Sequence, residues 1–309
     1  MSPPPAKAIR IGPRLRVGEA PGFLAQPWHG WFRLAIRLPR GSHRAVRWLA
    51  RFSPPAHEVL LENSTVGACF IDLRETICTQ LYLGGRYPHQ SGQDLLLRRL
   101  AVPGQTVFDL GANIGFYTRL FAGAVGPAGT VVAVEPARRA LRLLRLNAGL
   151  CAATVHVVPK AVSGSVGRLF LYETKKLDLS YCLPCGSASA AEVATTTIDC
   201  LAAEWGPPGL IKIDVEGFED AVLAGARRTL ESDNPPIVMF EHIADLAARC
   251  GQRPLDDVLG RFPGGRYKIL RVGINGELAE IKSADSAQLS NDYLAVPVRR
   301  PPHALPEAP

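Results

Sequence analysis

The stretch TVFDLGANIGFYT, residues 106–118, decides the fold that this sequence can adopt. A short β-branched apolar run comes first, a turn with Gly111 and Gly115 follows, and a helical pattern begins near residue 115. A glycine at position 115 lets the backbone approach a ligand closely and opens the helix. The order of strand, glycine turn and helix predicts a ligand-binding loop at the carboxyl end of a buried strand.

The loop lacks the glycine pattern of a pyrophosphate site, because Asn113 stands at the second glycine position of G-x-G-x-x-G. Asp109 would repel a phosphate, and it suits a cationic ligand with an amino group and a sulfonium. Glu135 ends the next apolar run, where a carboxylate can accept both hydroxyls of a ribose. The loop therefore predicts a cationic nucleoside ligand; the alternative is a tight turn with a surface glutamate.

Outward from this loop, short apolar runs alternate with helical stretches. The expected strands are 106–111, 130–135, 154–159, 167–173, 210–215 and 236–242, and the expected helices begin near 115 and span 137–150 and 219–232. Short β-branched runs between helices indicate a parallel sheet covered on both faces. The pattern predicts an α/β fold with a doubly wound, Rossmann-like sheet.

The two ends of the chain differ from this central pattern. Runs at 267–272 and 292–298 predict a closing strand pair, so that the sheet gains an antiparallel strand. A small β element and a helix are expected before the first core strand. The expected organisation is a basic N-terminal extension (1–57), an entry β/helix segment (58–100), the α/β domain (101–300) and a disordered Pro-rich tail (301–309).

Four carboxylates fall within IKIDVEGFED, residues 211–220. Asp214 and Glu216 follow a strand and share a face if the strand continues that far. Glu219 and Asp220 fall in the first turn of the next helix, where the macrodipole favours acids. The segment therefore divides into a functional pair and a structural pair.

The next strand ends in a carboxylate and a histidine, Glu241 and His242. Ligands of a doubly wound sheet bind beyond the carboxyl ends of its strands, so both strand ends are expected to face one cleft. The candidate catalytic residues are Asp214, Glu216, Glu241 and His242. His242 could instead be a structural, hydrogen-bonded histidine, and Lys212 could simply neutralise Asp214.

A divalent metal held by Asp214, Glu216 and Glu241 is a further reading, since hard cations bind clustered carboxylates. Neighbouring acids at strand ends rarely supply a full set of oxygen ligands, and we expect no metal.

Several motifs occur in the order of one family. DLGANIGFYT (109–118) with VEP (134–136) resembles the cofactor loop of class I S-adenosylmethionine-dependent methyltransferases. The later segments are similar to the FkbM family of methyltransferases, over roughly residues 58–298. They are VVPKAVSGSVGRLFLY (157–172), ATTTIDCL (194–201), LIKIDVEGFEDAVLAGARRTL (210–230), PPIVMFEH (235–242) and NDYLAVP (291–297).

The resemblance implies a Rossmann-like fold, S-adenosylmethionine, and methyl transfer mostly to hydroxyls of sugars, glycolipids or polyketides. It implies that the loop residues Asp109, Gly111, Asn113 and Gly115 hold the methionine part of the cofactor, that Glu135 binds the ribose, and that Ala161 and Val162 lie near the adenine. The sequence departs from the family before the loop, where Pro88 follows Tyr87 in place of the usual Glu. Such a transfer needs alignment of acceptor, methyl and sulfur, and a base for the hydroxyl proton.

The positive charge of the chain belongs to its first 57 residues. They hold ten Lys and Arg and one acid, whereas the remainder holds 25 basic and 27 acidic residues. Within them, residues 28–52 mix Trp, Phe and Arg at near-helical spacing, which fits peripheral contact with an anionic membrane or polyanion. The alternative is an Arg-rich extension that packs its aromatics on the main domain.

Cysteine usage and the absence of a secretory pattern indicate the cellular compartment, and two rival functions are considered. The seven cysteines do not have the spacing of a disulfide framework. Cys182 and Cys185 form a lone C-x-x-C without further Cys or His residues that could complete a zinc site. No secretory pattern is present, so we expect a cytoplasmic protein. A small-molecule or glycan acceptor is expected, and no nucleic acid. The rivals are a nicotinamide-dependent oxidoreductase, which Asn113 disfavours, and a non-catalytic adaptor that acts through the basic extension.

Overall fold

The computed structural model describes residues 8–11, 15–19, 42–51, 58–84, 91–173, 181–183, 190–273, 275–281 and 291–299. Tyr87, Cys185, the tail 301–309 and most of the segment 28–52 lie outside these ranges. The chain divides into two compact units, Met1–His89 and Gln90–Pro309, and each is described by itself. No helix among the described residues is long and apolar enough to cross a membrane.

The first unit contains a four-stranded antiparallel sheet, in the order β1-β2-β3-β4. Its elements are β1 (Ala8–Ile11), β2 (Leu15–Glu19), α2 (Ser42–Arg51), β3 (Glu58–Ser64), β4 (Gly67–Asp72) and α3 (Thr76–Gly84). The hairpin of β3 and β4 is the β element expected after residue 58. Val46 of α2 is buried, whereas Trp48 on the same helix is 61% exposed.

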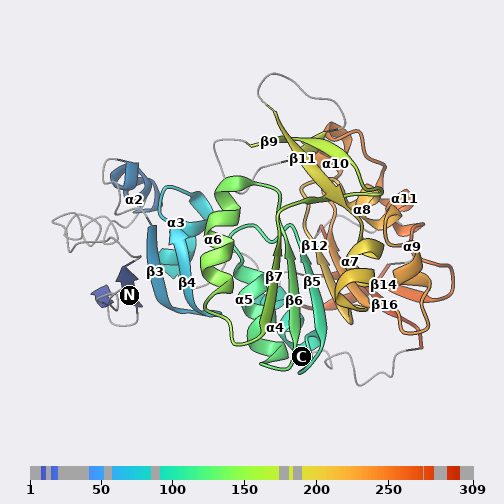
Figure 1. The fold of residues 1–309 in the computed structure, drawn as a ribbon, viewed down its shortest axis with the longest axis horizontal. Helices are drawn as coiled ribbons and strands as arrows, with labels where there is room; N and C mark the ends of the chain where they lie inside the picture. The colour runs from blue at the N-terminus through green and yellow to red at the C-terminus, as the bar shows by residue number, and fades with distance from the viewer. Residues whose placement is uncertain are drawn as a thin grey trace. The chain divides into compact units, whose positions relative to one another are not determined.

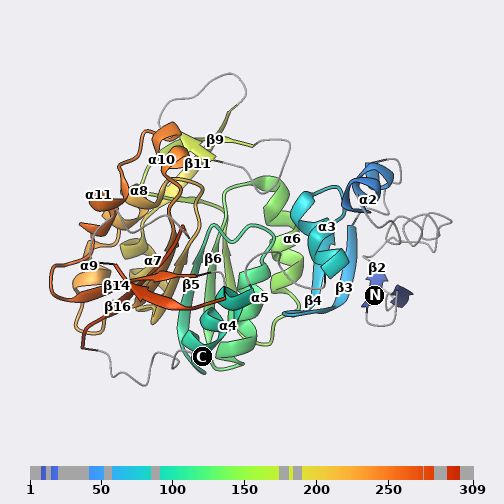
Figure 2. The same cartoon turned by 180° about the vertical axis from the view of Figure 1, so that it is seen from behind.

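The second unit is built on an eight-stranded sheet in the order β15-β14-β16-β13-β12-β5-β6-β7 (Figures 1 and 2). Its strands are β5 (Thr106–Leu110), β6 (Thr130–Val134), β7 (Thr154–Val158), β12 (Leu210–Ile213), β13 (Ile237–Glu241), β14 (Tyr267–Val272), β15 (Leu278–Glu280) and β16 (Asp292–Pro297). The strands from β7 to β13 pair in parallel, and β16, β14 and β15 pair antiparallel. The predicted doubly wound sheet with an antiparallel closing strand is confirmed.

The strand order reverses between β5 and β12. From β5 the chain proceeds outward through β6 and β7, and from β12 it proceeds the other way through β13. Two parallel strands whose crossovers leave in opposite directions open a crevice at their carboxyl ends, where ligands of such sheets bind. The predicted ligand loop follows β5 and the predicted carboxylate segment follows β12, so both meet at this point.

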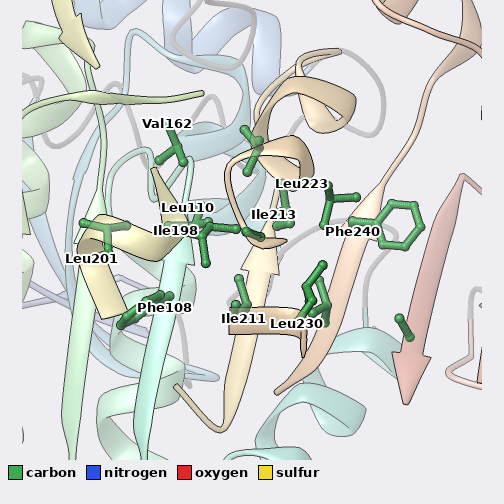
Figure 3. Packing of buried hydrophobic residues seen from close by; sticks show 14 of the residues in the cluster. Phe108, Leu110, Val162, Ile198, Leu201, Ile211, Ile213, Leu223, Leu230 and Phe240 are labelled. Atoms are coloured by element: carbon green, nitrogen blue, oxygen red, sulfur yellow. The ribbon is translucent and has the colours of Figure 1, made fainter. Parts of the chain in front are cut away.

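One face of the sheet packs against α7 (Ile198–Trp205), α8 (Glu219–Ala224), α9 (Arg227–Glu231) and α11 (Leu255–Leu259), which Figure 1 draws in yellow to orange. Alternate strand residues such as Phe108, Leu110 and Ile213 point into this core, together with Leu223 and Phe240 (Figure 3). Because side chains alternate along a strand, Asp109 and Lys212 point to the opposite face.

The opposite face packs against α4 (Ser91–Leu100), α5 (Phe116–Val125) and α6 (Arg138–Ala148), drawn in green in Figure 1. Beneath α6, Leu141 and Leu144 pack on Ala133. The helix α4 is the one predicted before the first core strand. Its position beside α5 brings residues upstream of the ligand loop to the same face as Asp109 and Lys212.

The prediction that residues 167–173 join the main sheet is wrong. They form β9 (Arg168–Tyr172), which pairs antiparallel with β10 (Tyr181–Leu183) and β11 (Ala191–Thr196) in a separate sheet completed by β8 (Ala161–Val162). Leu169 and Leu171 are buried while Arg168 is exposed. Such alternation is typical of an antiparallel strand with one solvated face.

Two predicted boundaries also need correction. The single helix expected over 219–232 is divided at Gly225 into α8 and α9. The Gly225 carbonyl oxygen accepts from the Asp199 amide at 3.0 Å, and an added Cβ there would lie 2.4 Å from the Ser163 carbonyl oxygen, so the backbone packs closely on that segment. The turn-rich segment before residue 292 contains a further short strand, β15, which pairs with β14. A helical region after β13 is confirmed and contains α10 (Ala244–Arg249) and α11.

Candidate active site

Two loops meet at the carboxyl ends of β5 and β12. The Asp214 amide donates to the Leu110 carbonyl oxygen at 2.9 Å. Gly111 has φ +79°, and a Cβ there would lie 1.8 Å from the Asp214 carbonyl oxygen. Only glycine fits so close an approach, so Gly111 serves the contact between the two loops.

Both loops contain a strained residue. Asn113 has φ 49° and Glu216 has φ 54°, and within the described part of the chain these are the non-glycine residues with positive φ. Such conformations cost of order 1–3 kcal/mol and cluster at functional sites. Their concentration in the two loops of the crevice marks this place as the candidate active site.

Gly115 begins α5 with φ +88°. A Cβ at this position would lie 2.7 Å from Leu144 Cδ1 of α6. The glycine therefore allows α5 and α6 to pack closely, and in this way it fixes where the preceding Asn113 lies.

Asp109 is fully buried beneath the first loop. Its Oδ2 accepts a 2.6 Å hydrogen bond from the Thr118 hydroxyl, while Oδ1 has no partner among the described residues. Burial raises the pKa of Asp109, and Lys212 and Thr118 act in the opposite direction. Within the described part of the chain, the Asn113 side-chain oxygen is likewise buried and without a partner. These two acceptors, one near the end of β5 and one in the loop that follows, fit a ligand that supplies N–H donors and positive charge.

Glu135 follows β6 and faces the same loop. Its Oε2 accepts from the Asn113 amide at 2.9 Å and its Oε1 from the Ala137 amide at 2.8 Å. Burial nevertheless raises the pKa of Glu135 to about 7. The carboxylate is thus held in place with acceptor capacity left for ligand hydroxyls, because each carboxylate oxygen can accept more than one bond.

Lys212 is the centre of the second half of the site. Its Nζ lies 2.9 Å from Asp214 Oδ2 and 4.5 Å from the centroid of the Tyr117 ring, and the residue is 6% exposed. Burial alone would lower the pKa of Lys212, but the charges of Asp214, Asp109 and Glu241 together raise it. The sequence-based interpretation of Lys212 as a counterion of Asp214 agrees with this geometry.

A carboxylate that was not among the predicted site residues completes this group. Asp94 of α4 is buried, accepts a hydrogen bond from the Tyr117 side chain, and leaves Oδ1 without a partner within the described structure. Burial raises the pKa of Asp94 to about 6, against the opposing effect of Tyr117, Arg98 and Lys212. We call Lys212 with Asp94, Asp109, Asp214 and Glu241 the Lys212 cluster.

Glu241 reaches the Lys212 cluster from the end of β13. It pairs in register with Asp292, the first residue of β16. Burial first, and then the charges of Asp214 and Asp292, raise the pKa of Glu241 to about 8. Asp292 accepts a hydrogen bond from the Gln93 side-chain amide. The carboxylates of the cluster outnumber its single lysine, which favours a cationic ligand.

The predicted set of catalytic residues does not face one cleft. Asp214 and Glu241 belong to the Lys212 cluster. His242, one residue after Glu241, instead lines a cavity beside α10 and α11. Successive residues at a strand end point to opposite faces, which explains the separation. The argument that Asp214 and Glu216 share a strand face also fails, because β12 ends at Ile213 and Glu216 lies in the strained turn.

The remaining predicted residues occupy two places. Ala161 and Val162 form the short strand β8, and Val162 packs in the core with Ile198 (Figure 3). Glu219 and Asp220 lie in the first turn of α8, as predicted. Asp220 makes a two-pronged ion pair with Arg261, at 2.7 and 3.0 Å. Across the described ranges, no three His, Cys, Asp or Glu side chains are arranged to hold a metal ion.

A protein-family model matches the part of the chain that contains this site. Residues 109–253 match the model of the methyltransferase FkbM domain, which begins at Asp109 and includes both loops and the end of β13. A search of curated proteins gives no significant match.

Solved structures show distant likenesses. A TehB-like S-adenosylmethionine-dependent methyltransferase from Corynebacterium glutamicum is 13% identical, with 72% of this chain and 93% of that chain covered and a TM-score of 0.40. An O-methyltransferase from Thermotoga maritima is 13% identical, with 78% of each chain covered and a TM-score of 0.38. An O-methyltransferase from Bacillus cereus, in complex with SAH, is 14% identical, with 66% and 78% covered and a TM-score of 0.38. The assignment below rests on the family match and on the residues of the site.

Proposed function

We propose that this chain, whose residues 109–253 match the methyltransferase FkbM domain, is an S-adenosylmethionine-dependent methyltransferase that methylates a hydroxyl oxygen of a small-molecule acceptor. The observation that supports this reading is the Lys212 cluster, which lies at the carboxyl ends of β5, β12 and β13 beside the ligand loop. Its excess of buried carboxylates suits both a cationic cofactor and the removal of a hydroxyl proton.

The residues of the first loop fit the cofactor. Asp109 and Asn113 offer buried acceptor oxygens that have no partner among the described residues, and these suit the amino group of its methionine part. Glu135 offers acceptor capacity for the ribose hydroxyls. S-adenosylmethionine supplies an electrophilic methyl group on a positively charged sulfur. We assign Gly111 and Gly115 to the positioning of this loop, and Ala161 and Val162 to the adenine side.

Glu241 is the proposed general base. A base acts most effectively when its pKa lies near the working pH, and the pKa of Glu241 is raised to about 8. Asp214, whose side chain is 30% exposed and bonded to Lys212, is proposed to orient the acceptor hydroxyl. Glu216, in the same turn, is proposed to line the acceptor path.

The acceptor is proposed to be a hydroxyl-bearing sugar, glycolipid or polyketide. The test is incubation of the protein with cell extract and S-adenosylmethionine carrying a labelled methyl group, followed by mass spectrometry. We expect one class of hydroxyl compound to gain the label at oxygen. Label found only on nitrogen, carbon or sulfur would contradict O-methylation while leaving the methyltransferase assignment in place.

A second role is proposed for the basic extension, on the strength of one observation. Trp48 on α2 is 61% exposed, and Arg44 on the same helix is exposed as well. An exposed aromatic beside cationic side chains suits the interface of an anionic membrane. We propose that residues 28–52 provide peripheral membrane contact for the enzyme.

A further inference from the structure

A cavity of ≈ 440 Å³ lies beside His242, between the end of β13 and the helices α10 and α11. Figure 1 shows these two helices in orange beside α8. We call this cavity the His242 pocket. Its lining residues are His242, Ala244, Ala248, Gln252, Arg253, Pro254, Leu255, Asp256, Asn291 and Tyr293.

His242 is the buried polar group of the pocket. The residue is 5% exposed, and neither Nδ1 nor Nε2 has a hydrogen-bond partner within the described structure. Burial lowers the pKa of His242, which favours the neutral imidazole with one donor and one acceptor. Buried polar groups are normally satisfied, and two unsatisfied nitrogens at a cavity wall indicate a polar ligand.

The rest of the lining defines the chemistry of that ligand. Gln252 and Asn291 carry side-chain amides, each of which can donate and accept. Arg253 and Asp256 contribute opposite charges, so the pocket has no net charge. Pro254 and Leu255, with two alanines, provide an apolar wall. This combination suits an uncharged group with several hydroxyls and one apolar face.

The pocket adjoins the active site through two paired strands. The Glu241–Asp292 register pair lies at the Lys212 cluster, and the next backbone contact is the 2.7 Å hydrogen bond from the His242 amide to the Asn291 carbonyl oxygen. Each strand thus places one residue at the cluster and its neighbour at the pocket. Because His242 and Asn291 directly neighbour Glu241 and Asp292 in the chain, the pocket and the cluster lie at the same end of β13 and β16.

We propose that the His242 pocket is the specificity site for the non-reacting part of the acceptor, and that it takes an uncharged ring with neighbouring hydroxyls, such as a monosaccharide. The inference rests on the proposed function for its role in catalysis. Binding to the pocket itself is independent of the cofactor.

The test is a titration of the full-length protein, labelled with ¹⁵N in its histidine rings, with the methyl glycosides of glucose, galactose, mannose, xylose and rhamnose. No cofactor is added. We expect at least one glycoside to shift the His242 ring-nitrogen signals, which the His242→Phe variant identifies by their loss. The same glycoside should bind about tenfold or more weakly to His242→Phe and to Gln252→Met, since each variant removes a hydrogen-bonding group.

His156→Phe is the matched control, because His156 lies on β7, stacks on Trp205 and is remote from the pocket lining. Its glycoside affinity should equal that of the unmodified protein. If none of the glycosides shifts the His242 signals, the inference is overturned, even where the extract assay gives methylated product. Glycoside binding at His242 together with an extract assay that gives no product would instead overturn the proposed function and leave the pocket assignment standing.

Discussion

At the scale of single residues, the position of Lys212 between four carboxylates determines how the active site titrates. Its ammonium group lies 2.9 Å from Asp214 and interacts with Asp109 and Glu241. The charge of Lys212 lowers the pKa of Asp94, Asp109 and Glu241, so its removal would raise the pKa of all three carboxyl groups. The lysine therefore keeps part of the cluster ionised while Glu241, with a pKa raised to about 8, remains available for proton transfer.

The first prediction concerns Glu241. Glu241→Gln should lower kcat by about 10²–10⁴-fold, since a general base contributes that much to the rate. In the unmodified enzyme kcat/KM for the acceptor should rise with pH, because the base must lose its proton. Its midpoint should lie at or below about 8, since the positive charge of the cofactor favours the carboxylate. A pH profile that keeps its rising limb in Glu241→Gln would assign the limb to another group.

The second prediction separates the two acids of the 211–220 segment. Asp214→Asn should abolish or strongly reduce methylation with the fold intact, because Asp214 lies at the cluster and is partly exposed to the crevice. Asp220→Asn is the matched control: it breaks the ion pair with Arg261 and should cost about 1–3 kcal/mol in the free energy of unfolding while activity is retained. Denaturant melts and methyl-transfer rates measure the two effects, and normal turnover by Asp214→Asn would refute the division.

At the scale of elements, the contact between the β5 and β12 loops fixes the geometry of the crevice. The Asp214 carbonyl oxygen occupies the space in which a side chain at position 111 would lie.

A third prediction follows for glycines with similar backbone conformations. Gly111→Ala should destabilise the fold by about 1–3 kcal/mol more than Gly104→Ala, since Gly104 has φ +76° but nothing within 4 Å of its Cβ position. Equal losses of unfolding free energy in the two variants would show that the loops do not press together.

The short helix α8 leads to a fourth prediction, about pH. Glu219 accepts from the Gly217 amide, leaves Oε2 unpaired within the described structure, and has its pKa raised by burial to about 7, from an ordinary value of 4.5. The folded state then binds the proton more tightly than the unfolded state. The resulting stability is present below about pH 4.5 and is lost as pH rises towards about 7. Glu219→Gln should reduce this fall in the free energy of unfolding, and an unchanged pH dependence would contradict the role of Glu219.

At the scale of the whole molecule, the sheet was predictable because its signals are local. The β-branched runs and the glycine loop at 106–118 predict parallel strands and a ligand loop, and the acids after β12 predict the crevice edge. A single helix was predicted where the structure has α8 and α9. Its division was not predictable, because Gly225 packs on Ser163, which is distant in the sequence.

The rest of the site could not be predicted, because it depends on contacts between segments that are distant in the sequence. Asp94 lies on α4, and nothing in its own sequence shows that α4 packs beside α5 and brings it to Lys212. His242 was expected to face the same cleft as Glu241. It lines another cavity, because successive residues at a strand end point to opposite faces of the sheet. Local patterns located the crevice, and tertiary packing determined which side chains enter it.

A fifth prediction concerns the basic extension, which belongs to the first of the two compact units. Deletion of residues 1–57 should leave methyl transfer to a water-soluble acceptor in place and abolish co-sedimentation with phosphatidylserine vesicles. Vesicles of phosphatidylcholine alone are the control, because binding to anionic lipid is electrostatic. Undiminished co-sedimentation of the truncated protein would refute a membrane role for residues 28–52.

The central claim is that the crevice between β5 and β12 binds S-adenosylmethionine, and calorimetric titration tests it most directly. S-adenosylmethionine should bind the full-length protein at one site per chain, and NADH should give no heat of binding. Asp109→Asn should weaken the affinity for S-adenosylmethionine about tenfold or more, since it removes the buried negative charge that faces the ligand loop. Binding of NADH in place of S-adenosylmethionine, or of neither, would contradict the account.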